Sequence, residues 1–225
     1  MKKNILYKNK EYNNIREVVN EAIENYPESV AFTIKYKEKK ETKYRYVTYK
    51  ELGEEVNALG TELIHLGLKS KRIAVIGKNS YEWALGYLAV LNGVGIVIPL
   101  DKGLPKQEIE LSLQRSGADA IIFDESNADI IQEIRVGKQT KVTTYISMGN
   151  STKYGFNSMN KLIEDGKKLV DSGDKSYIDA KIDNEKMSII LFTSGTTSLS
   201  KAVMLSHKNI ASNISAMNAM VKFCS

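Results

Sequence analysis

The chain has 225 residues and a formal net charge of +5, with 42% hydrophobic and 26% charged residues. This composition is that of a globular protein with room for one sizeable core or two smaller ones. Cys224 is the only cysteine, which excludes an intrachain disulfide, and two widely separated histidines, His65 and His207, suggest no metal cluster. Basic residues are spread over turns such as Lys37–Lys40, which favours a solvated surface and no nucleic-acid partner.

The first residues, MKKNILYKNKEYNN, lack the long apolar core of a signal peptide. A single cysteine also suits a reducing compartment, so we expect a cytoplasmic protein. Segment 83–100, WALGYLAVLNGVGIVIPL, is uncharged and long enough to cross a membrane, but its second half is interrupted by Asn92, Gly93, Gly95 and Pro99. We therefore predict no transmembrane segment. Its first half repeats at helical spacing and its second half is β-branched, so we predict a helix and then a buried strand.

Periodicity and cap signals predict an alternation of strands and helices along the chain. Residues 30–47 are predicted as two strands joined by a charged turn. A capping box of Thr48 and Glu51 opens the next helix, which Gly67 ends. The further predicted elements, in chain order, are strand 72–77, a helix capped by Asn79 and Glu82, strand 94–98, a helix from Pro105 to Gly117, strand 118–124, helix 126–136, strand 142–148, helix 158–170, a strand from Met187, strand 201–206, and a helix that Ser206 caps, with Ile210, Ile214, Met217 and Val221 on one face.

Alternating strands and helices with short connections predict an α/β fold, in which a mostly parallel sheet is flanked by helices on both faces. The continuous apolar strands agree, because a strand covered on one face only would alternate in polarity. An antiparallel hairpin near the end is predicted to carry a polar loop. We divide the chain into an N-terminal segment with a hairpin, the βα units, a polar connection, and the loop-bearing hairpin with its helix, at residues 1–47, 48–148, 149–186 and 187–225.

The most unusual stretch is TSGTTSLSK, residues 193–201. Its hydroxyl groups, Gly195 and the charge of Lys201 supply what a phosphate-binding loop needs, which is donors, a tight turn and a cation. Gly195 and Lys201 nearly reproduce Walker A spacing, but Ser200 and Ala202 replace the glycine and the Ser/Thr that flank the lysine in that motif. The alternative interpretation is a flexible serine- and threonine-rich turn within a hairpin.

From Thr193 to Asn209 the sequence TSGTTSLSKAVMLSHKN resembles the phosphate-loop signature of the adenylate-forming superfamily. That signature is roughly Thr-Ser-Gly-Thr-Thr-Gly-x-Pro-Lys-Gly-Val, then an apolar pair and Ser/Thr-His-x-Asn. Ser198, Ser200 and Ala202 stand where the family has glycine, proline and glycine. The upstream segments VTYKELGEEVNALGTELIHLGL and RIAVIGKNSYEWALGYLAVLNGVGIVIPLD follow the family's order, and the stretch KAVMLSHKN most resembles long-chain fatty acyl-CoA synthetases.

The resemblance implies a ligase that joins a carboxylate, here a fatty acid, to the α-phosphate of ATP and then transfers the acyl group to a thiol, usually coenzyme A. It implies that the loop holds the outgoing phosphates, with Lys201 contributing charge and Thr196 contacting Mg²⁺. The implied nucleotide-binding residues are Thr193, Ser194, Gly195, Thr196, Thr197, Ser198 and Lys201.

Family members are far longer, so we expect this chain to be an incomplete N-terminal domain that has no catalytic residue of its own and is inactive alone. Two alternatives stay open: a non-catalytic nucleotide-binding or interaction module, and an adenylation domain that loads the thiol of a carrier protein. His207 is a candidate for a direct role, but its place in the first turn of a predicted helix also suits a structural one.

Overall fold

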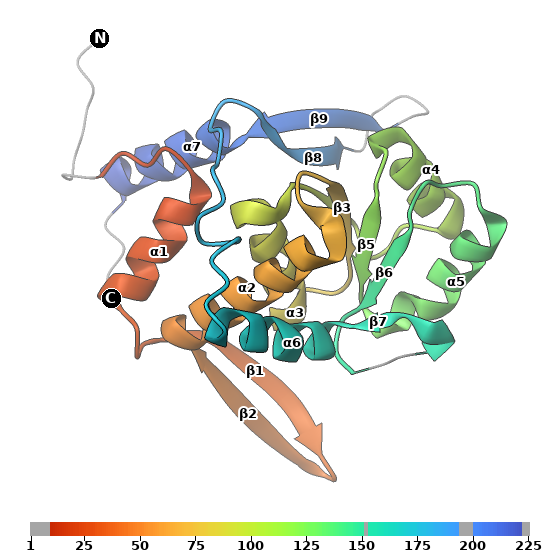
Figure 1. The fold of residues 1–225 in the computed structure, drawn as a ribbon, viewed down its shortest axis with the longest axis horizontal. Coiled ribbons are helices and arrows are strands. Elements are labelled where there is room, and N and C mark those ends of the chain that lie inside the picture. Colours follow the sequence, from red (N-terminus) through yellow and green to blue (C-terminus); the bar gives the residue numbers. More distant parts are fainter. Residues whose placement is uncertain (1–9, 151–152, 194–199, 222–225) are drawn as a thin grey trace.

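The computed structural model describes residues 10–150, 153–193 and 200–221, and its centre is a seven-stranded sheet (Figure 1). The strand order is β7-β6-β5-β3-β4-β8-β9, with parallel pairing from β7 to β8 and antiparallel pairing between β8 and β9. The predicted α/β fold is therefore confirmed. The strands are β3 Arg72–Ile76, β4 Ile96–Leu100, β5 Ala120–Phe123, β6 Thr144–Ser147, β7 Asn157–Ser158, β8 Met187–Thr193 and β9 Lys201–Ser206.

Helices cover both faces of this sheet, as its continuous apolar strands require. Along β3, Ile73 and Val75 point into one core, which helices α2, α3 and α6 cover, whereas Ala74 and Ile76 point into the other, which α4 and α5 cover. A polar substitution on either side of β3 would therefore be buried. The helices are α2 Tyr49–Leu63, α3 Tyr81–Ala89, α4 Lys106–Ser116, α5 Ala128–Gly137 and α6 Met159–Asp171.

Local cap signals set most helix boundaries. The capping box of Thr48 and Glu51 is present, and Gly117 ends α4 in the left-handed region at φ 62°, as predicted. Segment 83–100 forms α3, a π-helical turn η2 at Val90–Val94 and then β4. Among the described residues, none of the helices has the length and apolar content that crossing a membrane requires.

The start of α3 corrects one sequence prediction. Ser80, and not Asn79, is the N-cap: its backbone is extended and its hydroxyl accepts from the Trp83 amide at 3.2 Å. The helix begins one residue later than expected, because the hydroxyl of Ser80 already satisfies the free amide three residues along. Three further short helical turns are η1 Ile64–Leu68, η3 Glu125–Asn127 and η4 Lys153–Gly155.

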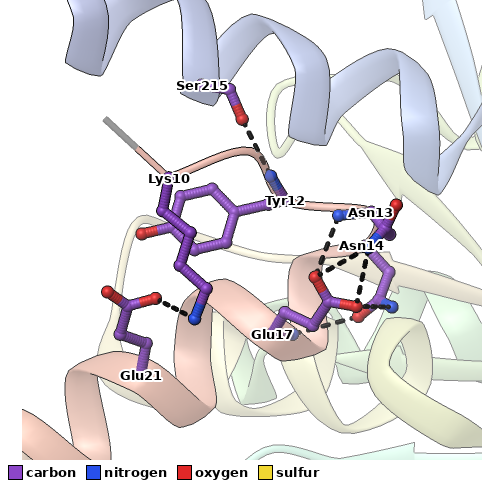
Figure 2. Close-up of polar contacts among 7 residues, drawn as sticks. All are labelled: Lys10, Tyr12, Asn13, Asn14, Glu17, Glu21 and Ser215. Atoms are coloured by element: carbon purple, nitrogen blue, oxygen red, sulfur yellow. Dashed lines mark hydrogen bonds and ion pairs between the residues drawn. The ribbon is translucent and has the colours of Figure 1, made fainter. Parts of the chain in front are cut away.

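The sequence analysis missed helix α1, Ile15–Asn25, which Asn14 caps by accepting from the Glu17 amide at 3.0 Å. Figure 2 shows the segment before α1 lying against α7, His207–Met220, with the Tyr12 amide donating to Ser215 Oγ at 3.1 Å. The predicted apolar stripe on α7 is confirmed in its first half only: Ile210 and Ile214 pack against the core, whereas Met217 and Val221 are exposed. The fully buried positions of α7 repeat every four residues and carry small side chains, which allow the helix to lie close to its neighbours: Ala211, Ser215 and Ala219, after His207.

Strands β1, Val30–Glu38, and β2, Glu41–Thr48, form a separate antiparallel hairpin that projects from the body of the molecule (Figure 1). The two strands were predicted within residues 30–47. Only the base of the hairpin is buried, at Val47, whereas its outer two thirds are largely exposed. It is thus anchored at one end and free to solvent along most of its length.

Candidate functional site: the end of the β8–β9 hairpin

The candidate phosphate loop joins β8 to β9, so it connects two antiparallel strands as predicted, and not a strand to a helix. The last paired residues are Thr193 and Lys201, and Thr193 Oγ1 donates to the Lys201 carbonyl oxygen at 3.5 Å. The two ends of the loop are therefore held together at one rung of the sheet. Because β4 and β8 run parallel, with Val97 opposite Ile189, their carboxyl ends reach the same edge of the sheet, where α/β folds commonly bind ligands.

Most of the predicted nucleotide-binding residues lie outside the described part of the chain. Of the predicted set, the structure places Thr193 and Lys201, while the positions expected to contact phosphate or magnesium between them fall in the segment 194–199. These undescribed positions are Ser194, Gly195, Thr196, Thr197 and Ser198. Within the described ranges, no cluster of three or more His, Cys, Asp or Glu side chains that could hold a metal ion is found.

Thr193 and Lys201 lie on the same face of the hairpin, because directly paired residues of antiparallel strands project to the same side. Leu191 and Val203, the next pair of this set, share that face, and Leu191 packs against the core that α2, α3 and α6 cover. Both Thr193 and Lys201 are exposed, and Lys201 makes no ion pair with a carboxylate in the described ranges. A cation is thus available to an anionic ligand at the loop's base.

Arg115, near the end of α4, supports the loop from the opposite face, and the sequence analysis missed it. Its Nη1 donates to the Ser200 carbonyl oxygen at 2.7 Å, and its guanidinium lies 5.6 Å from the ring centroid of Phe192. Phe192 packs against the second core, on the side away from Thr193. Arg115 therefore fixes Ser200, the residue before Lys201. Only the twist and register of the sheet bring residues 85 positions apart into contact, so no local sequence signal could have found this pair.

A charged pair also follows the parallel strands β3 and β5, but its members are engaged with each other and with the backbone. Lys78 Nζ lies 3.5 Å from Asp124 Oδ2, and Asp124 Oδ1 accepts from the Ser126 amide and hydroxyl at 2.9 and 2.7 Å. Burial acts to raise the pKa of Asp124, but the Ser126 hydrogen bonds and the Lys78 charge outweigh it and lower the pKa. Asp124 therefore remains ionised and serves as the cap of a helical turn.

His207 has a structural position. It is 3% exposed, and its Nδ1 accepts from the Ile15 amide at 3.3 Å, which joins the start of α7 to the start of α1. Burial lowers the pKa of His207, in keeping with a neutral ring that accepts a hydrogen bond. The ring is almost wholly buried and joins two helices, so the structure supports the structural role of His207.

Comparison with known proteins places this hairpin in a family. The sequence model for the family described as AMP-binding enzyme matches residues 19–224. The chain belongs to this AMP-binding enzyme family. The unit that carries the phosphate-loop resemblance is strand–loop–strand, in contrast to the strand–loop–helix unit of Walker A proteins.

The relatives of this AMP-binding enzyme chain have names that describe different activities. Bacitracin synthase 2 of Bacillus licheniformis is 29% identical over 169 residues, which are 75% of this chain and 6% of that protein. Long-chain-fatty-acid–CoA ligase 5 of Mus musculus is 26% identical over 186 residues, which are 77% of this chain and 27% of that protein. The chain therefore spans less than a third of the length of either relative.

Solved structures share the fold of this AMP-binding enzyme chain. A long-chain-fatty-acid-CoA ligase from Archaeoglobus fulgidus matches with a TM-score of 0.72 and 19% identity, covering 92% of this chain and 39% of that one. An anthranilate CoA ligase in complex with anthranoyl-AMP matches with a TM-score of 0.72 and 19% identity, covering 88% of this chain and 35% of that one. At these identities the likeness establishes the fold alone.

Proposed function

We propose that this chain is the N-terminal part of an acyl-CoA synthetase, which forms an acyl-adenylate from ATP and a fatty acid and then a thioester with coenzyme A. The family match supports the adenylate-forming class. The fatty-acid assignment is supported by relatives such as fatty acyl-CoA synthetase A of Dictyostelium discoideum, 27% identical over 181 residues. In this proposal the domain is incomplete, and residues 1–225 alone do not catalyse the reaction.

One observation carries the proposal at the level of residues: Lys201 is an exposed cation at the base of the loop, forms no ion pair with the described carboxylates, and lies next to Thr193 on the same face. In adenylation the β- and γ-phosphates leave as pyrophosphate, so charge accumulates on them in the transition state. A lysine fixed on a strand stabilises that charge without a cost of reorganisation at the moment of reaction. We assign the hydroxyl and amide donors around the phosphates to the proposed set Thr193–Ser198.

A magnesium ion belongs to the same proposal. We assign a magnesium contact to Thr196, which lies outside the described residues, since a hydroxyl oxygen beside phosphate oxygens suits a hard cation. When bound, Mg²⁺ would offset phosphate charge. The described residues contribute to this environment through the Lys201 cation and through Arg115, which holds Ser200 in place.

The test uses the polypeptide that the complete gene encodes and measures pyrophosphate release with a panel of fatty, aromatic and amino acids. Medium- or long-chain fatty acids should be preferred. Lys201→Ala and Thr196→Val should each lower kcat/KM by two or more orders of magnitude, because a lost charge-assisted phosphate contact costs a few kcal/mol, roughly 3. The matched control Lys181→Ala, an exposed lysine away from the loop, should retain full activity.

The same assay distinguishes a wrong substrate assignment from a wrong assignment of the phosphate-binding residues. A preference for amino acids or aromatic acids removes the fatty-acid assignment but keeps the ligase. Full activity of both loop variants would contradict the phosphate role. If activity is lost, a melting temperature equal to that of the parent shows that the loss is not one of stability, and substitution of the exposed Lys201 should change stability by less than about 0.5 kcal/mol.

A second candidate function is the loading of a carrier-protein thiol. It is favoured by the similarity to bacitracin synthase 2 and to a nonribosomal peptide synthetase of Aspergillus flavus, 27% identical over 180 residues. Supplying coenzyme A and a phosphopantetheinylated carrier protein in parallel reactions distinguishes the two, since only the true acceptor will accumulate the thioester. Absence of both pyrophosphate release and thioester would favour a non-catalytic nucleotide-binding module.

A further inference from the structure

The projecting β1–β2 hairpin holds most of the molecule's excess positive charge. Residues 30–48 contain six basic side chains and two acidic ones, a net charge of +4, while the whole chain has a formal net charge of +5. The basic residues of this segment are therefore gathered on one element of the fold. Figure 1 shows that this element extends away from the body of the molecule.

The pairing register sorts these residues onto two different faces, since directly opposed residues of antiparallel strands project to the same side. The opposed pairs Thr33–Tyr46, Lys35–Tyr44 and Lys37–Thr42 form one face. All six of these residues are exposed, with Tyr44 and Tyr46 at 51% and 59%. We call this the outward face. It consists of two lysines, two tyrosines and two threonines, and the turn residues Lys39 and Lys40 extend its charge.

The other face is occupied by contacts with the body and by the two acidic residues. Phe32 packs edge-on against Tyr81 of α3 at 5.3 Å between ring centroids, and Arg45 Nη2 lies 3.3 Å from Glu55 Oε1 of α2. Near the turn, Glu38 and Glu41 are opposed on this face, where Glu38 pairs with Lys43. The contacts at its base hold the hairpin in one orientation, so the outward face is presented to solvent as a fixed surface.

We propose that the outward face binds the surface of a membrane that contains anionic lipids. Tyrosine suits this position because its ring is apolar while its hydroxyl remains hydrated, and lysine reaches lipid phosphates with an extended stem. A nine-residue strand is roughly 30 Å long, and the face is open along that length, so all its side chains can meet a flat anionic surface at once. A bilayer is such a surface.

The open shape of the outward face favours a bilayer over a nucleic acid. Lys35 lies opposite Tyr44, and Lys37, Lys39 and Lys40 continue the charge toward the tip. A single-stranded nucleic acid is bound in a positively charged groove that follows its backbone, whereas this face is an exposed side of a projecting hairpin. The inference does not rest on the proposed ligase activity and survives its failure.

The test is co-sedimentation of the 225-residue chain with phosphatidylcholine vesicles containing or lacking one quarter phosphatidylserine, at low salt. Binding should require phosphatidylserine and weaken in high salt. Lys35→Gln with Lys37→Gln should lower the partition coefficient about 25-fold, since each lysine near an anionic surface contributes roughly fivefold, equal to about 1 kcal/mol. Tyr44→Ser with Tyr46→Ser should lower it several-fold at unchanged charge.

The control variant carries Lys175→Gln with Lys181→Gln, which removes the same charge from exposed positions outside the hairpin and should change binding by less than about twofold. Circular dichroism and thermal melting check that each variant is folded. If the tyrosine variant is unfolded, the lysine variant alone decides whether the outward face binds the membrane. Equal loss in the control, or equal binding to neutral vesicles, overturns the proposal. Binding to a poly(U) oligonucleotide with the same hairpin dependence, and none to vesicles, overturns it in favour of nucleic acid.

Discussion

Replacing Arg115 with alanine should weaken ATP binding about fivefold while the fold stays intact. The side chain is exposed, so its hydrogen bond to the Ser200 carbonyl at 2.7 Å and its position over Phe192 are both screened by water. Each of these contacts is worth about 0.5–1 kcal/mol at such a site, and together they hold the loop end in place by about 1 kcal/mol. In the variant, the loop end must be ordered when the nucleotide binds, so about 1 kcal/mol of binding free energy is lost. The affinity for ATP then falls about fivefold.

The assay is the KM for ATP in the pyrophosphate-release measurement, with Arg135→Ala as the matched control. Arg135, on α5, also donates to a backbone carbonyl, that of Tyr154 at 3.1 Å, and also lies over aromatic rings, but its contacts do not involve the hairpin. Arg135→Ala should therefore leave the KM unchanged at equal net charge. An unchanged KM in Arg115→Ala, or an equal rise in both variants, would refute the positioning role of Arg115.

Two further predictions concern stability. Gly166→Ala should lower the free energy of unfolding in urea by about 2 kcal/mol, because the added Cβ would lie 1.9 Å from the Ala58 carbonyl oxygen and the strain exceeds the helix-propensity gain of about 1 kcal/mol. In Gly86→Ala the nearest atom is 3.5 Å away, so this buried helical control should be neutral or slightly stabilised, and equal effects would contradict the steric argument. Because burial lowers the pKa of His207, its contribution to stability should be present above about pH 6.5 and lost as the pH falls, since the unfolded state then binds more protons. Unfolding of the parent and of His207→Gln between about pH 5 and pH 8 should show this slope in the parent only, and identical slopes would exclude the buried histidine as its cause.

Sequence reasoning succeeded where structure follows from local signals. The continuous apolar strands, the Thr48–Glu51 capping box and the left-handed Gly117 each depend on residues within one or two turns of each other. The strand that follows the loop was also predicted, because KAVMLS has no helical periodicity.

The remaining features depend on contacts between distant segments. Helix α1 has a local cap signal in Asn14, but its position is set by the amide of Ile15 meeting His207, 192 residues away. On α7 the apolar pattern identified the packed residues Ile210 and Ile214 but not the fully buried small residues, because close packing selects small side chains there and apolar periodicity favours large ones. For the candidate site, the loop ends were identified from sequence, whereas their support by Arg115 was not.

The length of β9 constrains how this loop can evolve. Lys201 begins a six-residue strand that ends at Ser206, and the next residue, His207, is buried against α1. A shift of β9 by one residue against β8 would move Lys201 to the opposite face and pull His207 out of its contact with Ile15. Insertions or deletions between 201 and 206 should therefore be selected against. Changes of length in this region will accumulate between Thr193 and Ser200, where the strand pairing on either side remains in place.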